Sequence, residues 1–273
     1  MVDQQNPIGV FDSGVGGLSV LRSIREKMPN EDVIYVGDQV HVPYGPRSME
    51  QIQIFSEAIT RFLLKHETKI IVVACNTASA AALKYLRETF SDFQFVGMEP
   101  AVKPAAEKTQ TGKVGVLATP ATFQGALYAS VVERFGAGVE LFQHTCPGLV
   151  SQIELGELDA PKTRAILEDA LLPMLEKNID TVVLGCTHYP FVIPLIKQIV
   201  GENVRVIDPA PSVARQVKRL LEAGGLLNSS GVVGKIQIHT SGDVKIVASV
   251  LPKLLNESMS VNSVTWKNDR EIL

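Results

Sequence analysis

The sequence predicts an α/β fold made of two pseudo-symmetric α/β domains with mainly parallel sheets. Short β-branched runs alternate with longer stretches in which apolar residues recur at helical spacing, a pattern typical of parallel βαβ units. The two halves of the chain also contain similar segments in the same order. With 273 residues, the chain is long enough for one large or two small domains.

Eight short runs are expected to form strands. Each has about four mostly apolar residues, as in parallel sheets that are covered on both faces. The runs are Ile8–Phe11, Val33–Val36, Ile70–Val73, Phe95–Gly97, Val114–Leu117, Val139–Phe142, Thr181–Leu184 and Val204–Ile207. The stretches between them predict helices at Met49–His66, Ala78–Phe90, Ala160–Asn178 and Pro211–Ala223. After the turn-rich segment 228–231 we expect a strand and a final helix.

The halves resemble each other at two places. Ile-Gly-Val-Phe-Asp-Ser at 8–13 is similar to Val-Gly-Val-Leu-Ala-Thr at 114–119, an offset of 114 − 8 = 106. Val-Val-Ala-Cys-Asn-Thr at 72–77 is similar to Val-Val-Leu-Gly-Cys-Thr-His at 182–188, where the cysteines are offset by 186 − 75 = 111. Similar offsets in the same order indicate a duplicated α/β domain, and symmetry places the boundary near residue 98.

Composition and charge exclude several classes of protein. The 45% hydrophobic and 20% charged residues are ordinary for a globular protein, and a net charge of −3 gives no electrostatic reason to expect nucleic acid or an anionic membrane as a partner. No apolar run approaches the roughly 18 residues of a membrane span, and no export signal is visible, so we expect a cytoplasmic protein. The three cysteines lack a Cys-x-x-Cys pair, which argues against a disulfide framework and a metal site.

Polar residues follow three of the predicted strands. Ligands of open α/β sheets bind outside the carboxyl ends of the strands. The groups at these ends are Asp12-Ser13, Cys75-Asn76-Thr77 and Cys186-Thr187-His188. If the two halves face each other, the thiols of Cys75 and Cys186 lie on opposite sides of one cleft, which is then the expected active site.

Two opposed thiols suit the inversion of an α-carbon, since a proton must leave one face and another must arrive at the opposite face. A thiol has a pKa of about 8.5, which a helix N-terminus or a histidine can lower. A single cysteine at a strand end is more often a small core residue. The duplicated positions of Cys75 and Cys186 favour the catalytic interpretation, whereas Cys146, in a turn-like Thr-Cys-Pro-Gly context, is expected to be structural.

The glycine-rich segment 12–18 is a weak signal for a dinucleotide. Its Gly-x-Gly-x-x-Gly template would need glycine where Ser19 stands, and no Gly-Lys-Ser/Thr follows. We expect this loop to bind the ammonium of an amino acid through Asp12 and its carboxylate through Ser13 and backbone N–H groups. The alternative is a tight strand–helix turn without a ligand.

For three further residues, a purely structural role is an alternative to a role in the site. Tyr44, in the rigid turn Val-Pro-Tyr-Gly-Pro at 42–46, is either a packing residue or part of a site. His188 either orients the Cys186 thiol or protonates an intermediate, or it is a hydrogen-bonded core histidine. Glu154 is expected at the surface on base rates alone.

Four motifs together resemble those of the glutamate racemases of the aspartate/glutamate racemase family. They are Gly-Val-Phe-Asp-Ser-Gly-Val-Gly-Gly-Leu at 9–18, Val-Pro-Tyr-Gly at 42–45, Ala-Cys-Asn-Thr-Ala-Ser at 74–79 and Gly-Cys-Thr-His-Tyr-Pro at 185–190. The resemblance implies interconversion of L-glutamate and D-glutamate for peptidoglycan, without pyridoxal phosphate, metal or other cofactor, by a protein that is a homodimer in many members.

The resemblance also implies roles for individual residues. Cys75 matches the thiol that acts on D-glutamate and Cys186 the thiol that acts on L-glutamate. Asp12, Glu154 and His188 match residues that assist the thiols or hold the ammonium. The implied substrate-binding residues are Asp12, Ser13, Tyr44, Gly45, Asn76, Thr77, Thr187 and His188. The family fold implies a first domain of residues 1–97 plus 209–273 and a second of residues 98–208.

Two other functions compete with this interpretation. Cys186 and His188 are the residue types of a Cys–His hydrolase or amidotransferase, although residues two apart on a turn need not meet and that chemistry needs no second cysteine. Two α/β lobes around a cleft are also typical of periplasmic amino-acid binding modules, against which the missing export signal counts.

Overall fold

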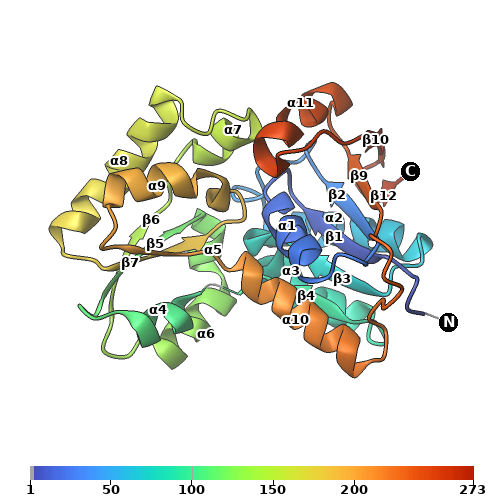
Figure 1. Cartoon of the computed structure of the whole chain (residues 1–273), viewed down its shortest axis with the longest axis horizontal. Helices are drawn as coiled ribbons and strands as arrows, with labels where there is room; N and C mark the ends of the chain where they lie inside the picture. The colour runs from blue at the N-terminus through green and yellow to red at the C-terminus, as the bar shows by residue number, and fades with distance from the viewer. Residues whose placement is uncertain (1–2, 100) are drawn as a thin grey trace.

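The computed structural model describes residues 3–99 and 101–273 and shows two lobes, each built on one sheet (Figure 1). The larger sheet has the strand order β10-β9-β2-β1-β3-β4 and the smaller sheet the order β6-β5-β7-β8. Neighbouring strands in both sheets are parallel. These findings confirm the predicted α/β fold with mainly parallel sheets.

The strands follow the predicted runs closely. The larger sheet contains β1 (Ile8–Asp12), β2 (Val33–Gly37), β3 (Ile70–Val73), β4 (Phe95–Gly97), β9 (Ile236–Thr240) and β10 (Val261–Ser263). The smaller sheet contains β5 (Lys113–Ala118), β6 (Glu140–His144), β7 (Thr181–Gly185) and β8 (Arg205–Ile207). Every residue of β1, β2, β3 and β7 is buried, because helices cover both faces of each sheet.

The two sheets repeat one arrangement. The order β2-β1-β3-β4 in the first lobe matches β6-β5-β7-β8 in the second. The segments that resemble each other in sequence are the central strands β1 and β5 and their neighbours β3 and β7. The two cysteines therefore follow equivalent strands.

Helices pack on both faces of each sheet. On the larger sheet, one face carries α2 (Met49–Lys65) and α3 (Asn76–Thr89), and the other carries α1 (Leu18–Lys27), α10 (Ala210–Ala223) and α11 (Val244–Leu255). The smaller sheet packs against α4 (Val102–Lys108), α6 (Ala126–Phe135), α8 (Pro161–Glu176) and α9 (Ile193–Val200). Shorter segments are α5 (Pro120–Gln124), α7 (Leu149–Glu154) and the 3₁₀ helix η1 (Tyr189–Val192). In the part of the chain described, no helix is long and apolar enough to span a membrane.

The chain returns to the first lobe after β8. Helix α10 packs against α1, and β9 pairs with β2, with Ile236 beside Val33. Figure 1 shows α10, α11 and the C-terminus in the same lobe as the N-terminal strands.

The expectation of a chain that ends in a helix is wrong. After α11 the chain adds β10 to the edge of the larger sheet and then forms an antiparallel hairpin of β11 (Trp266–Lys267) and β12 (Glu271–Ile272). Strands of two or three residues are too short to show an alternating apolar pattern. β10 pairs with β9, and the two hairpin strands pair with each other and pack against α2.

Candidate active site

Strands β1, β3 and β7 deliver the predicted site residues. Asp12 ends β1, Cys75 caps the N-terminus of α3 after β3, and Cys186 follows β7. The first two come from the larger sheet and Cys186 from the smaller one. All of the predicted site residues except Gly45 and Glu154 are buried.

Asp12 joins the two lobes. Its Oδ1 accepts the backbone N–H of Gly14 at 2.8 Å, and its Oδ2 accepts the Thr187 hydroxyl at 2.9 Å. Burial raises the pKa of Asp12, while the charge of His188 acts to lower it. The carboxylate is therefore fixed in orientation and sits beside groups from both lobes.

Cys75 is a buried thiol with two weak local contacts. Its Sγ accepts the N–H of Ala78 at 3.4 Å in the first turn of α3, and the Ser13 hydroxyl lies 3.8 Å away. Burial raises the pKa of Cys75, and the negative charge of Asp12 raises it further. Cys75 is thus held in its protonated form near neutral pH.

Cys186 begins a chain of three polar groups. Its Sγ lies 3.7 Å from Nδ1 of His188, and Nε2 of the same ring lies 2.6 Å from Glu154 Oε1. Burial acts to lower the pKa of His188, but the hydrogen bonds with Cys186 and Glu154 outweigh it and hold the pKa well above its usual value. Cys186 and His188, which need not have met, are in contact in this turn.

The expectation that Glu154 lies at the surface is also wrong. Its side chain is only 15% exposed, and Oε1 accepts the N–H of Val15 at 2.8 Å as well as binding His188. Glu154 ends α7 in the second lobe, so this contact crosses to the glycine-rich turn of the first lobe. The N–H groups of Gly14 and Val15 are therefore bonded to the protein's own carboxylates, which differs from the expectation that this turn's N–H groups bind a substrate carboxylate.

Close approach explains the glycines of this turn. A Cβ at Gly14 would lie 1.9 Å from Glu154 Oε1, and a Cβ at Gly16 would lie 2.4 Å from His188 Nδ1. Both distances are shorter than a non-bonded contact of a Cβ atom allows in a closely packed interior. The turn is tight because the polar groups of the second lobe pack directly on its backbone.

Asn76 and Thr77 occupy the first turn of α3. The Asn76 side chain is buried, yet neither its amide nitrogen nor its amide oxygen has a hydrogen-bond partner among the described residues. Buried polar groups in native proteins are rarely left without partners. An unpartnered amide at a helix N-terminus, which itself attracts anions, is suited to binding a small polar ligand.

Thr119 is a candidate site residue that our reasoning from the sequence missed. It follows β5, and its hydroxyl lies 3.0 Å from that of Thr77 in the other lobe. A Cβ on Gly45 would lie 3.6 Å from the Thr119 Cβ. The signal that identifies it is the internal repeat, because Thr119 holds the place in the second lobe that Ser13 holds in the first.

Tyr44 is both a packing residue and a hydrogen-bond donor. Its ring is buried among the side chains on the α2 face of the larger sheet, and its hydroxyl donates to Asp38 Oδ2 at 2.7 Å. Through the neighbouring Gly45 the same loop reaches Thr119. Tyr44 and Gly45 thus lie on a loop that approaches the second lobe.

Cys146 stands apart from this arrangement. It is packed in the core beside β6, and burial raises its pKa to about 12. Like the other two cysteines it is a free thiol. Across residues 3–99 and 101–273, no group of three or more His, Cys, Asp and Glu side chains is placed to hold a metal ion.

Comparison with known proteins shows the family to which the chain belongs. The sequence profile of the family described as Asp/Glu/Hydantoin racemase matches residues 8–217. The chain is 48% identical over 264 residues to the glutamate racemase of Pseudomonas aeruginosa, covering 97% of this chain and 99% of that protein.

Two solved structures have the same fold. The glutamate racemase of Escherichia coli, in complex with L-glutamate and the activator UDP-MurNAc-Ala, has a TM-score of 0.83 at 31% identity and covers 98% of this chain and 99% of its own. The glutamate racemase of Francisella tularensis, in complex with D-glutamate, has a TM-score of 0.82 at 32% identity and covers 97% of this chain and 98% of its own. The fold and the site therefore define an isomerase of the racemase class. The chain belongs to the Asp/Glu/Hydantoin racemase family.

Proposed function

We propose that this protein interconverts L-glutamate and D-glutamate with Cys75 and Cys186 as two acid–base groups. The observation that carries the proposal is the placement of two buried thiols at equivalent strand ends of the two lobes. A hydrogen bond from Thr187 to Asp12 connects the lobes at this place. The relatives that are glutamate racemases support glutamate as the substrate.

The proposed chemistry uses one thiol on each face of the α-carbon. With L-glutamate bound, Cys186 removes the α-proton and Cys75 returns a proton to the opposite face; with D-glutamate the two roles are exchanged. Each reaction consumes one thiolate and produces the other, so no net proton is gained or lost. Acid–base catalysis is most effective when both groups are close to the reacting carbon and have pKa values near the working pH.

Charge on the bound substrate would tune the Cys75 thiol. Without substrate, burial and the Asp12 carboxylate raise the pKa of Cys75. An α-ammonium bound at Asp12 and Ser13 would add a positive charge beside the thiol and lower its pKa, since an opposite charge within a few ångströms favours the ionised form. Cys75 is thus converted to the reactive thiolate only when an amino acid with its α-ammonium is bound.

Different side chains are assigned to the ammonium and to the carboxylates of glutamate. We assign the ammonium to Asp12 and Ser13, and the carboxylates to Asn76, Thr77 and the N-terminus of α3. Thr187, Tyr44 and Gly45 complete the binding residues, and Thr119 lies beside Thr77 within the same polar group. His188, which Glu154 binds, orients the Cys186 thiol.

We further propose that the product D-glutamate serves peptidoglycan synthesis in the cytoplasm and that the enzyme acts as a homodimer. The relatives named as glutamate racemases support the role in peptidoglycan synthesis only through the activity that they share. Sedimentation velocity of the purified protein tests the second part, which a monomer at micromolar concentration contradicts.

Circular dichroism of glutamate solutions tests the proposed activity directly. The purified protein is expected to bring either enantiomer to the racemic mixture, and Cys75→Ala and Cys186→Ala are each expected to abolish this change. Cys146→Ala is the matched control, since it removes a third buried cysteine and is expected to retain racemisation. Unaltered glutamate in the presence of the wild-type protein contradicts the proposal.

One observation favours a second candidate, a Cys–His hydrolase or amidotransferase. The 3.7 Å contact between Cys186 and His188 is the geometry that a cysteine nucleophile and its base require. An acyl-enzyme seen by intact-protein mass spectrometry supports this candidate. A requirement for Cys75 counts against it, because that chemistry uses one thiol.

A further inference from the structure

The loop between β2 and α2 carries two of the proposed binding residues without any regular structure of its own. Residues 38–48 contain neither helix nor strand. Tyr44 and Gly45 lie on this loop, and Gly45 approaches Thr119 of the other lobe. Because few backbone hydrogen bonds fix such a segment, side-chain contacts must hold its conformation.

Asp38 supplies the contacts within the loop. This carboxylate is fully buried at the end of β2. Its Oδ2 accepts hydrogen bonds from His41 Nδ1 at 2.8 Å and from the Tyr44 hydroxyl at 2.7 Å. One oxygen of Asp38 thus holds the loop.

The other oxygen of Asp38 holds the C-terminal part of the chain. Its Oδ1 accepts the Ser241 hydroxyl at 2.7 Å, just after β9, and the indole N–H of Trp266 at 2.7 Å, in β11. Trp266 is 228 positions away in the sequence. A single carboxylate therefore connects the loop to the C-terminal hairpin.

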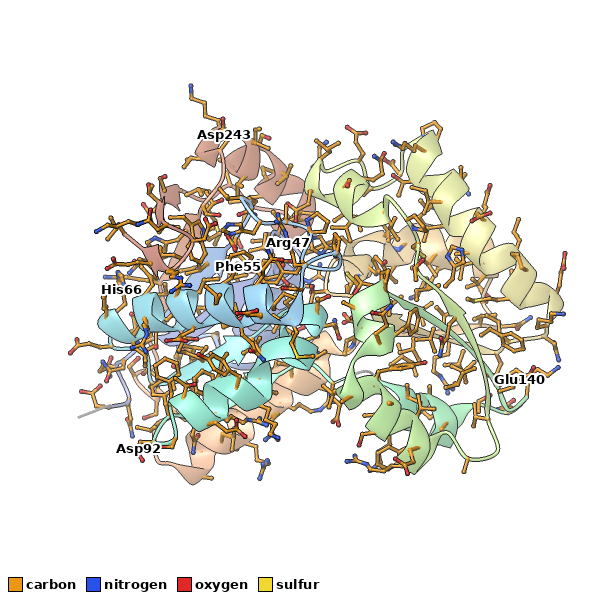
Figure 2. The ribbon with its side chains drawn as sticks, turned by 180° about the vertical axis from the view of Figure 1, so that it is seen from behind. Arg47, Phe55, His66, Asp92, Glu140 and Asp243 are labelled. Atoms are coloured by element: carbon orange, nitrogen blue, oxygen red, sulfur yellow. The ribbon has the colours of Figure 1, made fainter. Side chains whose placement is uncertain are left out.

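Aromatic packing reinforces this connection. The imidazole of His41 stacks on Phe55 of α2 with ring centroids 3.9 Å apart, and Trp266 meets both rings edge-on at 4.9 Å and 5.6 Å. Val264 and Ile272 of the C-terminal segment are buried in the same apolar cluster. In Figure 2, Arg47 lies toward the second lobe, His66 lies at the outer end of α2, and Phe55 lies between them.

We propose that Trp266 is a positioning residue, and that the C-terminal hairpin acts through Asp38 to hold Tyr44 and Gly45 in place for glutamate. This inference rests on the proposed racemase activity. Trp266 does not touch the proposed substrate site; it orients the carboxylate that orients the Tyr44 hydroxyl. The loop would otherwise sample conformations that lack the binding geometry, which weakens binding more than it slows proton transfer.

Trp266→Phe is the first test, because phenylalanine keeps an aromatic ring on His41 and Phe55 but removes the N–H. We expect KM for both enantiomers to rise about tenfold, as for the loss of one hydrogen bond to a charged group, and kcat to change less than about twofold. Glu271→Gln is the matched control. It weakens the surface contact between the same hairpin and Lys65, 3.6 Å away, and is expected to leave KM unchanged.

A double-mutant cycle with Tyr44→Phe separates positioning from general loosening of the fold. Since both hydroxyl and indole act through Asp38, the rise in KM of the double variant is expected to be smaller than the product of the two single rises. A folded Trp266→Phe variant with wild-type KM overturns the inference, as does a KM rise in the double variant equal to that product.

Emission from Trp266 gives a measurement on the unmodified protein, because it is the sole tryptophan of the chain. Addition of glutamate is expected to change its fluorescence with a midpoint near KM, and unchanged emission at saturating glutamate counts against the inference. Failure of the wild-type protein to racemise glutamate would instead overturn the proposed function itself. The two failures are therefore distinguishable.

Discussion

The carboxylate of Glu154 lies 2.6 Å from the imidazole Nε2 of His188. The same oxygen accepts the backbone N–H of Val15 from the other lobe. The histidine beside Cys186 is therefore held by a group that also fixes the glycine-rich turn after β1. Any change at Glu154 is expected to affect both the charge of His188 and the contact between the lobes.

Glu154→Gln tests this relationship. The amide keeps the size of the side chain but removes its charge, so the pKa of His188 is expected to fall. The loss is expected to lower the free energy of unfolding by about 1.5–3 kcal/mol. A raised pKa in the folded protein stabilises it fully below the unfolded pKa, so the difference is expected to be largest below about pH 6.5 and to vanish as pH rises through the folded pKa.

Denaturant unfolding at several pH values and NMR titration of the imidazole check this expectation. Glu157→Gln is the matched control, because it makes the same change at an exposed side chain of the same segment. A His188 pKa that is equal in the Glu154→Gln variant and the wild type contradicts the assigned cause.

Asn76→Ala is expected to separate binding from stability. Since the buried amide has no partner among the described residues, its removal sacrifices no internal hydrogen bond, and the free energy of unfolding should fall by no more than about 0.5 kcal/mol. KM for glutamate is expected to rise about tenfold or more because the amide binds substrate.

Ser79→Ala, one turn along α3, is the contrasting variant. The Ser79 hydroxyl donates to Val73 O at 3.0 Å and accepts the Met98 N–H at 2.8 Å. Its loss is expected to lower the free energy of unfolding by about 1–3 kcal/mol with little change in KM. Thermal unfolding and initial-rate kinetics measure both quantities, and the reverse pattern would refute the role of Asn76.

Gly16→Ala is expected to displace His188. The added methyl group would lie 2.4 Å from its Nδ1 and 2.7 Å from the Thr187 hydroxyl. A misplacement of this kind is expected to lower kcat/KM about a hundredfold. Gly224→Ala, where the nearest atom would lie 3.4 Å away, is expected to leave kcat/KM unchanged, and equal activity of the two variants would argue against close packing at Gly16.

Serine in place of either thiol is expected to affect the two directions unequally. A hydroxyl is a far weaker acid than a thiol, so Cys75→Ser and Cys186→Ser should each retain at most a slow reaction. Elimination of water or halide from a suitable glutamate analogue needs only one base, and each variant should therefore process the enantiomer that meets its remaining cysteine. Equal activity of each variant on both analogue enantiomers would exclude this assignment of faces.

Local patterns predict the residues at strand ends, and His188 as a residue that orients Cys186, but not the distant groups that hold these side chains in place. Asp12, Cys75 and Cys186 follow fully buried strands, and the change from an apolar run to a polar residue is visible in the sequence. The repeated order of strands in the two lobes follows from the repeated segments. Edge strand β6 ends two residues later than predicted and is only partly buried. A partly buried edge strand has a weaker apolar pattern, so its bounds are harder to predict.

Glu154 and Trp266 show why the remainder is not visible in local sequence patterns, although the family resemblance implied a role for Glu154. The contact from Glu154 to Val15 spans 139 positions and that from Trp266 to Asp38 spans 228. Neither residue lies in a local pattern that differs from an ordinary surface segment. Their roles arise only when the second lobe and the C-terminal hairpin pack against the loops of the first lobe.

Racemisation of glutamate in D₂O tests the central claim most directly. A thiol exchanges its proton with solvent, so a product made by two bases receives deuterium from the second thiol, while the removed proton remains on the first. We predict that early product of either enantiomer carries deuterium at the α-carbon and that recovered substrate retains protium. Product that keeps protium, or substrate that gains deuterium as fast as product does, would contradict the two-thiol account.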